Sequence, residues 1–158
     1  MNKVKFDSPI GRLEICEEEG KIIRIEIISS EEDFAENETA LLTEAKHQLS
    51  EYFFGKRREF DLPLEFSGTE FQKAVWGELI KIPYGKTKTY GEIAKAIGKP
   101  DAARAVGGAC NKNRILIAVP CHRIIGKNGN LTGFACGIDK KILLLSHEAG
   151  GKDGLYEA

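Results

Sequence analysis

The first third of the chain alternates between apolar and charged residues. Runs with a period of two cover residues 4–6, 13–15 and 23–27, and the turn sequences Ser8-Pro9-Ile10-Gly11 and Glu18-Glu19-Gly20-Lys21 separate them. Such alternation is typical of strands with one buried face, and short turns favour pairing between neighbouring strands. The pattern therefore predicts a small antiparallel sheet.

A helical period replaces this alternation after an acidic link at residues 29–38. Apolar residues recur every three or four positions over residues 38–54, and Gly55 is the expected stop of the helix. The side chains expected on its buried face are those of Leu41, Leu42, Ala45, Leu49, Tyr52 and Phe53. Because residues 1–60 contain no recognisable catalytic pattern, we expect residues 1–66 to form a scaffold domain of sheet and helix.

Three further helices are predicted in the second half of the chain. Ser67-Gly68-Thr69-Glu70 has the form of a capping box and opens a helix that stops at Pro83-Tyr84-Gly85. Thr89-Tyr90-Gly91-Glu92 has the same form and opens a short helix that ends at Gly98, and a third helix is expected over residues 101–110. Two short helices joined by a tight glycine turn predict a helix-turn-helix, a motif that commonly enters a DNA groove.

The remaining pattern completes a winged helix. The apolar run at residues 115–119 is expected to be extended, and strand-like runs flank the turn Lys127-Asn128-Gly129, a strong hairpin signal. A last helix is expected over residues 139–148, with Ile142, Leu143 and Leu145 on its inward face. We therefore predict an α+β protein of two domains: a small antiparallel sheet with a helix in residues 1–66, a winged-helix domain in residues 67–150, and a disordered tail at residues 151–158.

The formal net charge of −1 hides an uneven distribution. Residues 1–70 hold nine Lys and Arg against 17 Asp and Glu, whereas residues 71–126 hold ten against three. An acidic half joined to a basic half suggests that the basic half meets a polyanion, while an unevenly charged but merely solvated surface is the alternative.

Composition restricts the class of protein and its compartment. A hydrophobic content of 42% and a charged content of 30% are ordinary for a folded soluble protein, and no stretch approaches the roughly 18–20 apolar residues of a membrane span. The N-terminus lacks the apolar core of a signal peptide, so we expect a cytoplasmic protein, or a nuclear one if the source is eukaryotic. Cys16, Cys110, Cys121 and Cys136 have neither C-x-x-C spacing nor the density of a disulfide scaffold. Reduced thiols and no metal site are therefore expected.

The candidate chemistry lies in the segment 117–125. An apolar run leads Cys121 into a bend that Pro120 restricts, and His122 and Arg123 follow directly. A thiol attacks only as a thiolate, and nearby cations or a histidine lower its pKa. This segment alone leaves two interpretations open, a reactive cysteine and a buried structural one.

The third predicted helix is unusual in its small side chains. Residues 102–110 hold four alanines and two glycines, and Arg104 is the one long side chain among them. Small side chains allow a backbone to come close to a partner, although tight packing between helices explains the alanines equally well. Packing does not explain a lone arginine at this place.

With these elements placed, residues 67–150 resemble the O6-alkylguanine-DNA alkyltransferases, also called methylated-DNA–protein-cysteine methyltransferases. The matching segments, in the order of the family, are residues 71–76, 83–85, 89–94, 102–109, 111–113, the signature Pro120-Cys121-His122-Arg123, and residues 145–148. The turn Ser8-Pro9-Ile10-Gly11 resembles a weaker N-terminal pattern of the family, so the resemblance extends over the whole chain. It implies a ribonuclease-H-like N-terminal domain and a winged-helix DNA-binding domain.

The resemblance also implies a reaction. A thiolate attacks the alkyl carbon on O6 of guanine, or on O4 of thymine, and the cysteine keeps the alkyl group as a thioether, so each molecule acts once. Neither a metal nor an organic cofactor is needed. The expected partner is double-stranded DNA that contains O6-alkylguanine, bound through the minor groove by a monomer with no membrane association. The nucleotide must be flipped out, because a thiol cannot reach O6 inside the base stack.

The family pattern assigns roles to individual residues. It implies that Cys121 accepts the alkyl group, that His122 acts as base through a bridging water, and that Glu148 orients the imidazole. Tyr90 is implied to turn the phosphate and hydrogen-bond the base, and Arg104 to fill the space left in the duplex.

Supporting positions follow from the same resemblance. Gly107 and Gly108 are implied to let the helix sit close to DNA, and Asn113 to brace the active-site loop. The remaining residues expected to face DNA or to support the pocket are Thr89, Ala105, Pro120 and Ile124.

One segment departs from the family. Where members commonly carry Tyr, a small residue and Gly-Gly, this chain has Phe134-Ala135-Cys136-Gly137. Phe134 can stack on a base but has no hydroxyl, and Ala135 offers none, so stabilisation of guanine O6 is expected from backbone N–H groups. Cys136 is either inert filler at the rim of the pocket or a group that narrows the pocket against bulky alkyl groups.

Three other functions compete with this hypothesis. A non-catalytic sensor of alkylated guanine is the principal alternative, and the presence of Cys121 argues against it. A regulatory helix-turn-helix protein is disfavoured because Arg104 among alanines makes a poor base-reading helix. A cysteine hydrolase using Cys121, His122 and Glu148 lacks an oxyanion signature.

Overall fold

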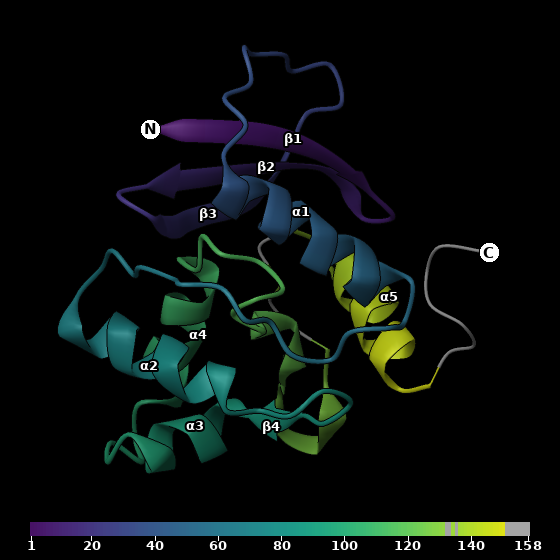
Figure 1. Ribbon diagram of the computed structural model, residues 1–158. Coiled ribbons are helices and arrows are strands. Elements are labelled where there is room, and N and C mark those ends of the chain that lie inside the picture. Colours follow the sequence, from purple (N-terminus) through teal and green to yellow (C-terminus); the bar gives the residue numbers. More distant parts are fainter. Residues whose placement is uncertain (132–133, 135, 151–158) are drawn as a thin grey trace. The chain divides into compact units, whose positions relative to one another are not determined.

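A computed structural model describes residues 1–131, 134 and 136–150 (Figure 1). The described chain forms two compact units, Met1–Phe66 and Ser67–Gly150. The predicted disordered tail at residues 151–158 lies outside the described residues, as do residues 132–133 and Ala135. None of the helices in the described part of the chain has both the length and the apolar character of a membrane span.

The first unit is a three-stranded antiparallel sheet covered by one helix. Strands β1 (Asn2–Ser8), β2 (Gly11–Glu18) and β3 (Lys21–Ile28) follow one another in space as in sequence, and α1 (Ala40–Phe53) packs on the sheet (Figure 1). Thr39 begins α1, because its side chain accepts a hydrogen bond from the backbone N–H of Leu42 at 3.1 Å. The sheet and helix predicted from the apolar periodicity are confirmed.

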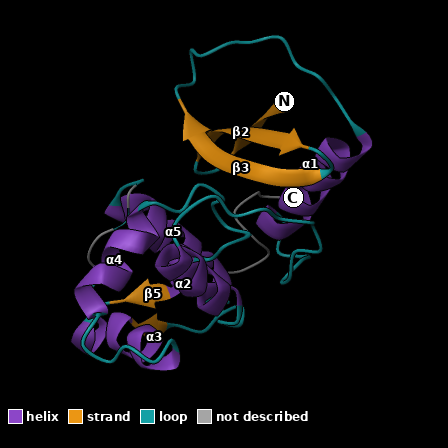
Figure 2. Cartoon of the chain, turned by 90° about the vertical axis from the view of Figure 1, so that its left-hand side faces the viewer, coloured by secondary structure: helices purple, strands orange, loops and turns teal. Residues whose placement is uncertain are grey.

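The second unit is built on three helices. They are α2 (Glu70–Ile80), α3 (Tyr90–Ala96) and α4 (Ala103–Asn111), which pack against one another (Figure 2). Trp76 of α2 ties the group together, since its buried indole N–H donates to the carbonyl of Ala109 at 2.9 Å. The predicted helix-turn-helix is present as α3 and α4.

The two predicted capping boxes had different outcomes. Thr89 begins α3 as predicted, with Glu92 completing the box at 2.9 and 3.1 Å. The box predicted at Ser67 is wrong, because α2 begins at Thr69 with Gln72 as its partner. Both tetrapeptides satisfy the same pattern. The chain at Gly68 passes close to Gln72 and Trp76, since an added Cβ would lie 2.6 Å from Oε1 of Gln72 and 2.7 Å from the ring of Trp76.

Part of the segment predicted as a wing pairs with the segment before α3. Strand β5 (Ile124–Ile125) follows the short 3₁₀ helix η1 (Cys121–Arg123) and pairs in parallel with β4 (Lys88–Thr89). The expected turn is present as η2 (Lys127–Gly129), closed by a 2.7 Å hydrogen bond from the N–H of Gly126 to the carbonyl of Asn130. The second run of the predicted hairpin, residues 130–134, lies partly outside the described residues, so the hairpin stays a prediction.

Two further expectations are wrong. Residues 115–119 are not extended, because the N–H of Ala118 turns back to the carbonyl of Leu116 at 2.7 Å. On α5 (Ile138–Glu148), Ile142 and Leu143 were expected to face inward but are 44% and 38% exposed, and Leu145 is only half-buried. The buried side chains of α5 are instead Lys141, Leu144, His147 and Glu148. This face packs on η1, so polar residues of the site occupy the positions that apolar periodicity would assign to the core.

Candidate functional site

Two tight turns deliver Cys121 to its position. Ile117 has φ of +70°, a conformation that a β-branched residue rarely adopts, and Pro120 has φ and ψ of −81° and 65°, the geometry of an inverse γ-turn. The N–H of Cys121 donates to the carbonyl of Val119 at 2.8 Å across the second turn. Cys121 is 4% exposed at the start of η1. Strained backbone of this kind persists where its surroundings hold it, and functional sites often contain it.

The side chain of Asn113 holds these turns in place. Its Nδ2 donates to the carbonyl of Val119 at 2.9 Å and to Sγ of Cys121 at 3.2 Å, while its Oδ1 accepts from the N–H of Ile115 at 2.9 Å. One amide therefore links both ends of the loop and gives the sulfur a hydrogen-bond donor. The structure brings Asn113, Pro120 and Cys121 together.

A buried ion-pair cluster lies next to the cysteine. Nε2 of His122 lies 2.6 Å from Oε2 of Glu148, and both side chains are buried. Arg123 donates two hydrogen bonds to the same carboxylate, from Nε to Oε1 at 2.7 Å and from Nη2 to Oε2 at 3.1 Å. Its Nη1 donates to the carbonyl of Ile82 at 2.7 Å, which attaches the cluster to the chain after α2. No role was predicted for Arg123 from the sequence, although its place directly after His122 was the available signal.

The protonation of the cluster follows from these contacts. Burial raises the pKa of Glu148, but the hydrogen bonds and charges of His122 and Arg123 outweigh it and hold that pKa well below its ordinary value. An ionised Glu148 accepts the Nε2–H of His122, which leaves Nδ1 as the lone-pair nitrogen. Burial lowers the pKa of His122 against the opposing effect of Glu148, so the imidazole is neutral near pH 7. Among the described residues, no hydrogen-bond partner contacts this buried Nδ1.

Burial works against ionisation of the nucleophile. It raises the pKa of Cys121 to about 11, and the charge of Cys136 acts in the same direction. The hydrogen bond from Asn113 and the charge of Lys141 lower it. No role was predicted for Lys141 from the sequence, although its position seven residues before Glu148 places both on one face of a helix.

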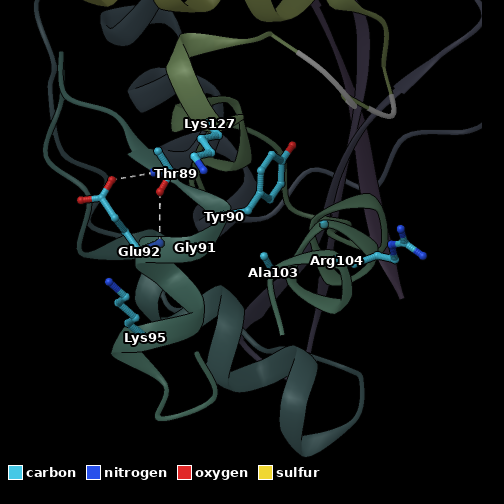
Figure 3. Close-up of a pocket in the computed structure, with 9 residues that line it drawn as sticks. Thr89, Tyr90, Gly91, Glu92, Lys95, Ala103, Arg104 and Lys127 are labelled. Atoms are coloured by element: carbon cyan, nitrogen blue, oxygen red, sulfur yellow. Dashed lines mark hydrogen bonds between the residues drawn. The ribbon is translucent and has the colours of Figure 1, made fainter. Parts of the chain in front are cut away.

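A pocket of about 650 Å³ opens beside α3 and α4 (Figure 3). Its lining residues are Thr89, Tyr90, Gly91, Glu92, Lys95, Ala103, Arg104, Gly107 and Lys127. Figure 3 shows Lys127 near Tyr90, while the side chain of Arg104 extends away from the other labelled residues. The ring of Tyr90 lies over Gly107, where an added Cβ would be 3.6 Å from it. Lys95 and Lys127 were not singled out from the sequence.

The other predicted positions that the structure describes do not line this pocket. Ala105 and Gly108 are exposed on α4 and do not line it. Phe134 and Cys136 are half-buried, and Ala135 is outside the described residues. Ile124 is buried in β5 and pairs with Lys88. Through this ladder, the segment that starts α3 with Tyr90 is fixed beside the segment that leaves η1 with Cys121.

Comparisons with known proteins agree with this arrangement. Two family models match the chain: 6-O-methylguanine DNA methyltransferase, ribonuclease-like domain, over residues 1–66, and 6-O-methylguanine DNA methyltransferase, DNA binding domain, over residues 70–150. A methylated-DNA–protein-cysteine methyltransferase of Methanosarcina acetivorans is 48% identical over 149 residues, which cover 90% of this chain and 95% of that protein. The constitutive enzyme of that name from Bacillus subtilis is 48% identical over 139 residues, covering 82% and 83%.

Solved structures give the same result. The structure of Mycobacterium tuberculosis OGT in complex with DNA superposes with a TM-score of 0.87 at 42% identity, over 95% of this chain and 94% of that one. A structure of the O6-methylguanine methyltransferase of the same organism gives a TM-score of 0.86, also at 42% identity, over 94% and 93%. Sequence, fold and site geometry thus agree, and the chain belongs to the family of methylated-DNA–protein-cysteine methyltransferases.

Proposed function

We propose that this protein repairs alkylated DNA by direct reversal, transferring an alkyl group from O6 of guanine, or O4 of thymine, to Sγ of Cys121. A bond forms between Sγ and the alkyl carbon, the bond from that carbon to O6 breaks, and guanine leaves with the electron pair. The product is a thioether, so each molecule acts once. The observation that supports this most is the setting of Cys121, a buried thiol with an amide donor beside a buried His–Glu pair.

The His–Glu pair supplies the route for the proton. Nδ1 of His122 is the basic nitrogen, and it takes the thiol proton of Cys121 through a bridging water. Glu148 accepts the Nε2–H and stabilises the imidazolium that forms, while Arg123 keeps the carboxylate ionised and oriented. The order nucleophile, base, orienting acid is that of a catalytic triad with a water inserted.

The exposed face of α4 is the proposed DNA surface. Arg104 is exposed there and enters the duplex from the minor groove, where it replaces the flipped nucleotide. Tyr90 lines the pocket beside it and hydrogen-bonds the departing base. Thr89 fixes the start of α3 through its capping bonds. The excess of basic residues in the segment 71–126 provides attraction to phosphates.

The rest of the molecule supports this activity. Residues 1–66 form the scaffold domain and residues 67–150 the domain that binds DNA and carries the chemistry. Phe134 stacks on the flipped base, and backbone N–H groups stabilise guanine O6. The protein acts as a monomer in the compartment that holds the DNA.

Mass spectrometry of the intact protein tests the proposal. After incubation with a duplex that contains one O6-methylguanine, the protein should gain the mass of one methyl group in place of a hydrogen. Cys121→Ser should gain nothing, whereas Cys110→Ser, which removes another buried thiol, should still be methylated. Tight binding without a mass change would indicate the non-catalytic sensor, and neither binding nor a mass change would overturn both functions.

A further inference from the structure

The turn segment at residues 82–86, between α2 and β4, contacts the buried ion-pair cluster. The carbonyl of Ile82 accepts a hydrogen bond from Nη1 of Arg123 at 2.7 Å, and Ile82 is itself buried. The N–H of Gly85 donates to Oε1 of Glu148 at 3.4 Å. Because Arg123 belongs to η1 and Glu148 to α5, the turn segment contacts both members of the ion pair from a third place in the chain.

The ring of Tyr84 adds contacts to the same two elements. Its centroid lies 5.7 Å from Cζ of Arg123, within the range of a cation–π contact. The ring also meets the imidazole of His147 on α5 edge to face, with 6.3 Å between the centroids. The half-buried Tyr84 therefore packs on the cluster at both η1 and α5.

The geometry of the turn segment requires glycine at position 85. The N–H of Lys86 donates to the carbonyl of Pro83 at 3.0 Å, which closes a β-turn with Gly85 as its third residue. Gly85 has φ of +78°, the sign that a type II turn requires at this place. An added Cβ would lie 3.1 Å from the backbone carbonyl oxygen of Glu148. A single methyl group is therefore enough to disturb the contact between the turn segment and Glu148.

The base depends on where the Glu148 carboxylate lies. Its Oε2 is 2.6 Å from Nε2 of His122, and its Oε1 accepts the N–H of Gly85. A carboxylate in this arrangement fixes the tautomer of the imidazole and stabilises the imidazolium that forms. A carboxylate that moves away from Nε2 would leave His122 a weaker base.

We propose that Tyr84 and Gly85 are positioning residues of the alkyl transfer, because the turn that they form holds the Glu148 carboxylate against His122. This inference rests on the proposed function and adds an outer layer to its proton route. Cys121 and His122 carry out the chemistry. The turn segment takes up no proton and forms no bond to the alkyl group.

The reactivity of the thiol towards iodoacetamide tests this without DNA. The rate of alkylation at Cys121 is measured over about pH 5–10, the span in which thiolates form in proteins, and peptide mass spectrometry distinguishes Cys121 from the other thiols. In Gly85→Ala, the weaker base should raise the apparent pKa of the Cys121 reaction by about one unit and slow it at neutral pH about tenfold. The variant leaves in place the ionisable groups that act on Cys121 and His122, namely Glu148, Arg123, Lys141 and Cys136.

Gly20→Ala is the matched control. Gly20 has the same φ of +78°, and its N–H also donates to a glutamate, Oε2 of Glu17, at 3.4 Å. Its added Cβ, however, would meet nothing within 4 Å. Alanine is disfavoured at such a φ, so the melting temperature should fall in both variants. The pH profile of Gly20→Ala should equal that of the wild type, because a merely structural loss lowers the melting temperature without moving the profile.

Tyr84→Leu tests the turn segment without backbone strain. It removes the ring contacts to Arg123 and His147, so the profile should shift in the same direction by a smaller amount. If Gly85→Ala does not fold, this variant decides alone. An unchanged profile in a folded Gly85→Ala or in Tyr84→Leu, or an equal shift in Gly20→Ala, overturns the inference. If the profile shifts but O6-methylguanine DNA leaves no methyl group on the wild type, the positioning role stands and the repair function fails.

Discussion

Gly108→Ala separates the stability of α4 from its approach to DNA. Gly108 is exposed to solvent and lies away from both ends of α4, and an added Cβ would meet nothing within 4 Å. In the free protein the methyl group therefore causes no clash. Glycine costs about 1 kcal/mol relative to alanine inside a helix, so the variant should be more stable by roughly that amount. For a chain of this length, such a gain corresponds to a rise in melting temperature of about 2–4 °C.

The same methyl group should weaken DNA binding. Gly108 lies four residues after Arg104 and shares its helix face, so a duplex that receives the arginine must approach the backbone at Gly108 closely. A methyl group there should cost at least about 1.4 kcal/mol, or tenfold in Kd. The affinity is measured by fluorescence anisotropy with a duplex that contains O6-methylguanine, at one fixed salt concentration.

Gly77→Ala provides the matched control for this experiment. Gly77 lies inside α2, and its added Cβ also meets nothing within 4 Å. It should give a similar gain in stability with no change in Kd. If Gly108→Ala binds DNA as tightly as Gly77→Ala, α4 does not approach the duplex at this position.

Three other predictions concern the buried cluster and the pocket. Arg123→Lys loses the pair of hydrogen bonds to the Glu148 carboxylate. The free energy of unfolding in urea should therefore fall by about 3 kcal/mol, and single-turnover methyl transfer should slow. Retained stability would contradict the role of the pair. The pKa of His122 is lowered in the folded state, so as pH falls the unfolded chain protonates this imidazole first. The free energy of unfolding should therefore decrease below about pH 6.5, by up to about 1.4 kcal/mol per pH unit. His122→Gln should remove this pH dependence. The depressed pKa of Glu148 adds a further loss below about pH 4.5, where the unfolded carboxylate is protonated first. Lys95→Gln and Lys127→Gln should each reduce the slope of log Kd against log salt by about one if these pocket lysines contact phosphates, and an unchanged slope would remove them from the interface.

Local signals were sufficient for most of the fold. The period-two runs predicted β1 to β3, and the box from Thr89 to Glu92 predicted the start of α3, because each depends on neighbours in sequence. The box at Ser67 failed because Thr69 and Gln72 satisfy the same rule two residues later. The pattern rule alone does not decide between the two boxes.

The wrong predictions concern segments in which polar side chains are buried. Apolar periodicity assigned Ile142 and Leu143 to the inner face of α5, whereas the structure buries Lys141 and Glu148. A pattern rule counts hydrophobic residues and has no means to recognise a charge that a distant segment satisfies. Arg123 was missed for this reason, since its partner Glu148 is 25 residues away on another element.

The apolar run before Cys121 shows the same limit. An uninterrupted apolar stretch indicates burial but does not distinguish a strand from a compact turn. Here the amide of Asn113 satisfies the backbone groups that a neighbouring strand would otherwise satisfy. When one side chain makes the hydrogen bonds that a neighbouring strand would make, the sequence shows no periodic pattern that would reveal it.

The ladder between β4 and β5 sets a constraint on any redesign of this protein. It has two rungs, Lys88 with Ile124 and Thr89 with Ile125. A slip by one residue would move one strand by about 3.3 Å and turn its side chains to the opposite face. The register of this ladder therefore fixes the separation between Tyr90, which starts α3, and the nucleophile Cys121, and that separation can change only in steps of one residue. A redesign meant to accept larger alkyl groups therefore has to keep the chain lengths that join these two strands and replace only the residues that surround the pocket.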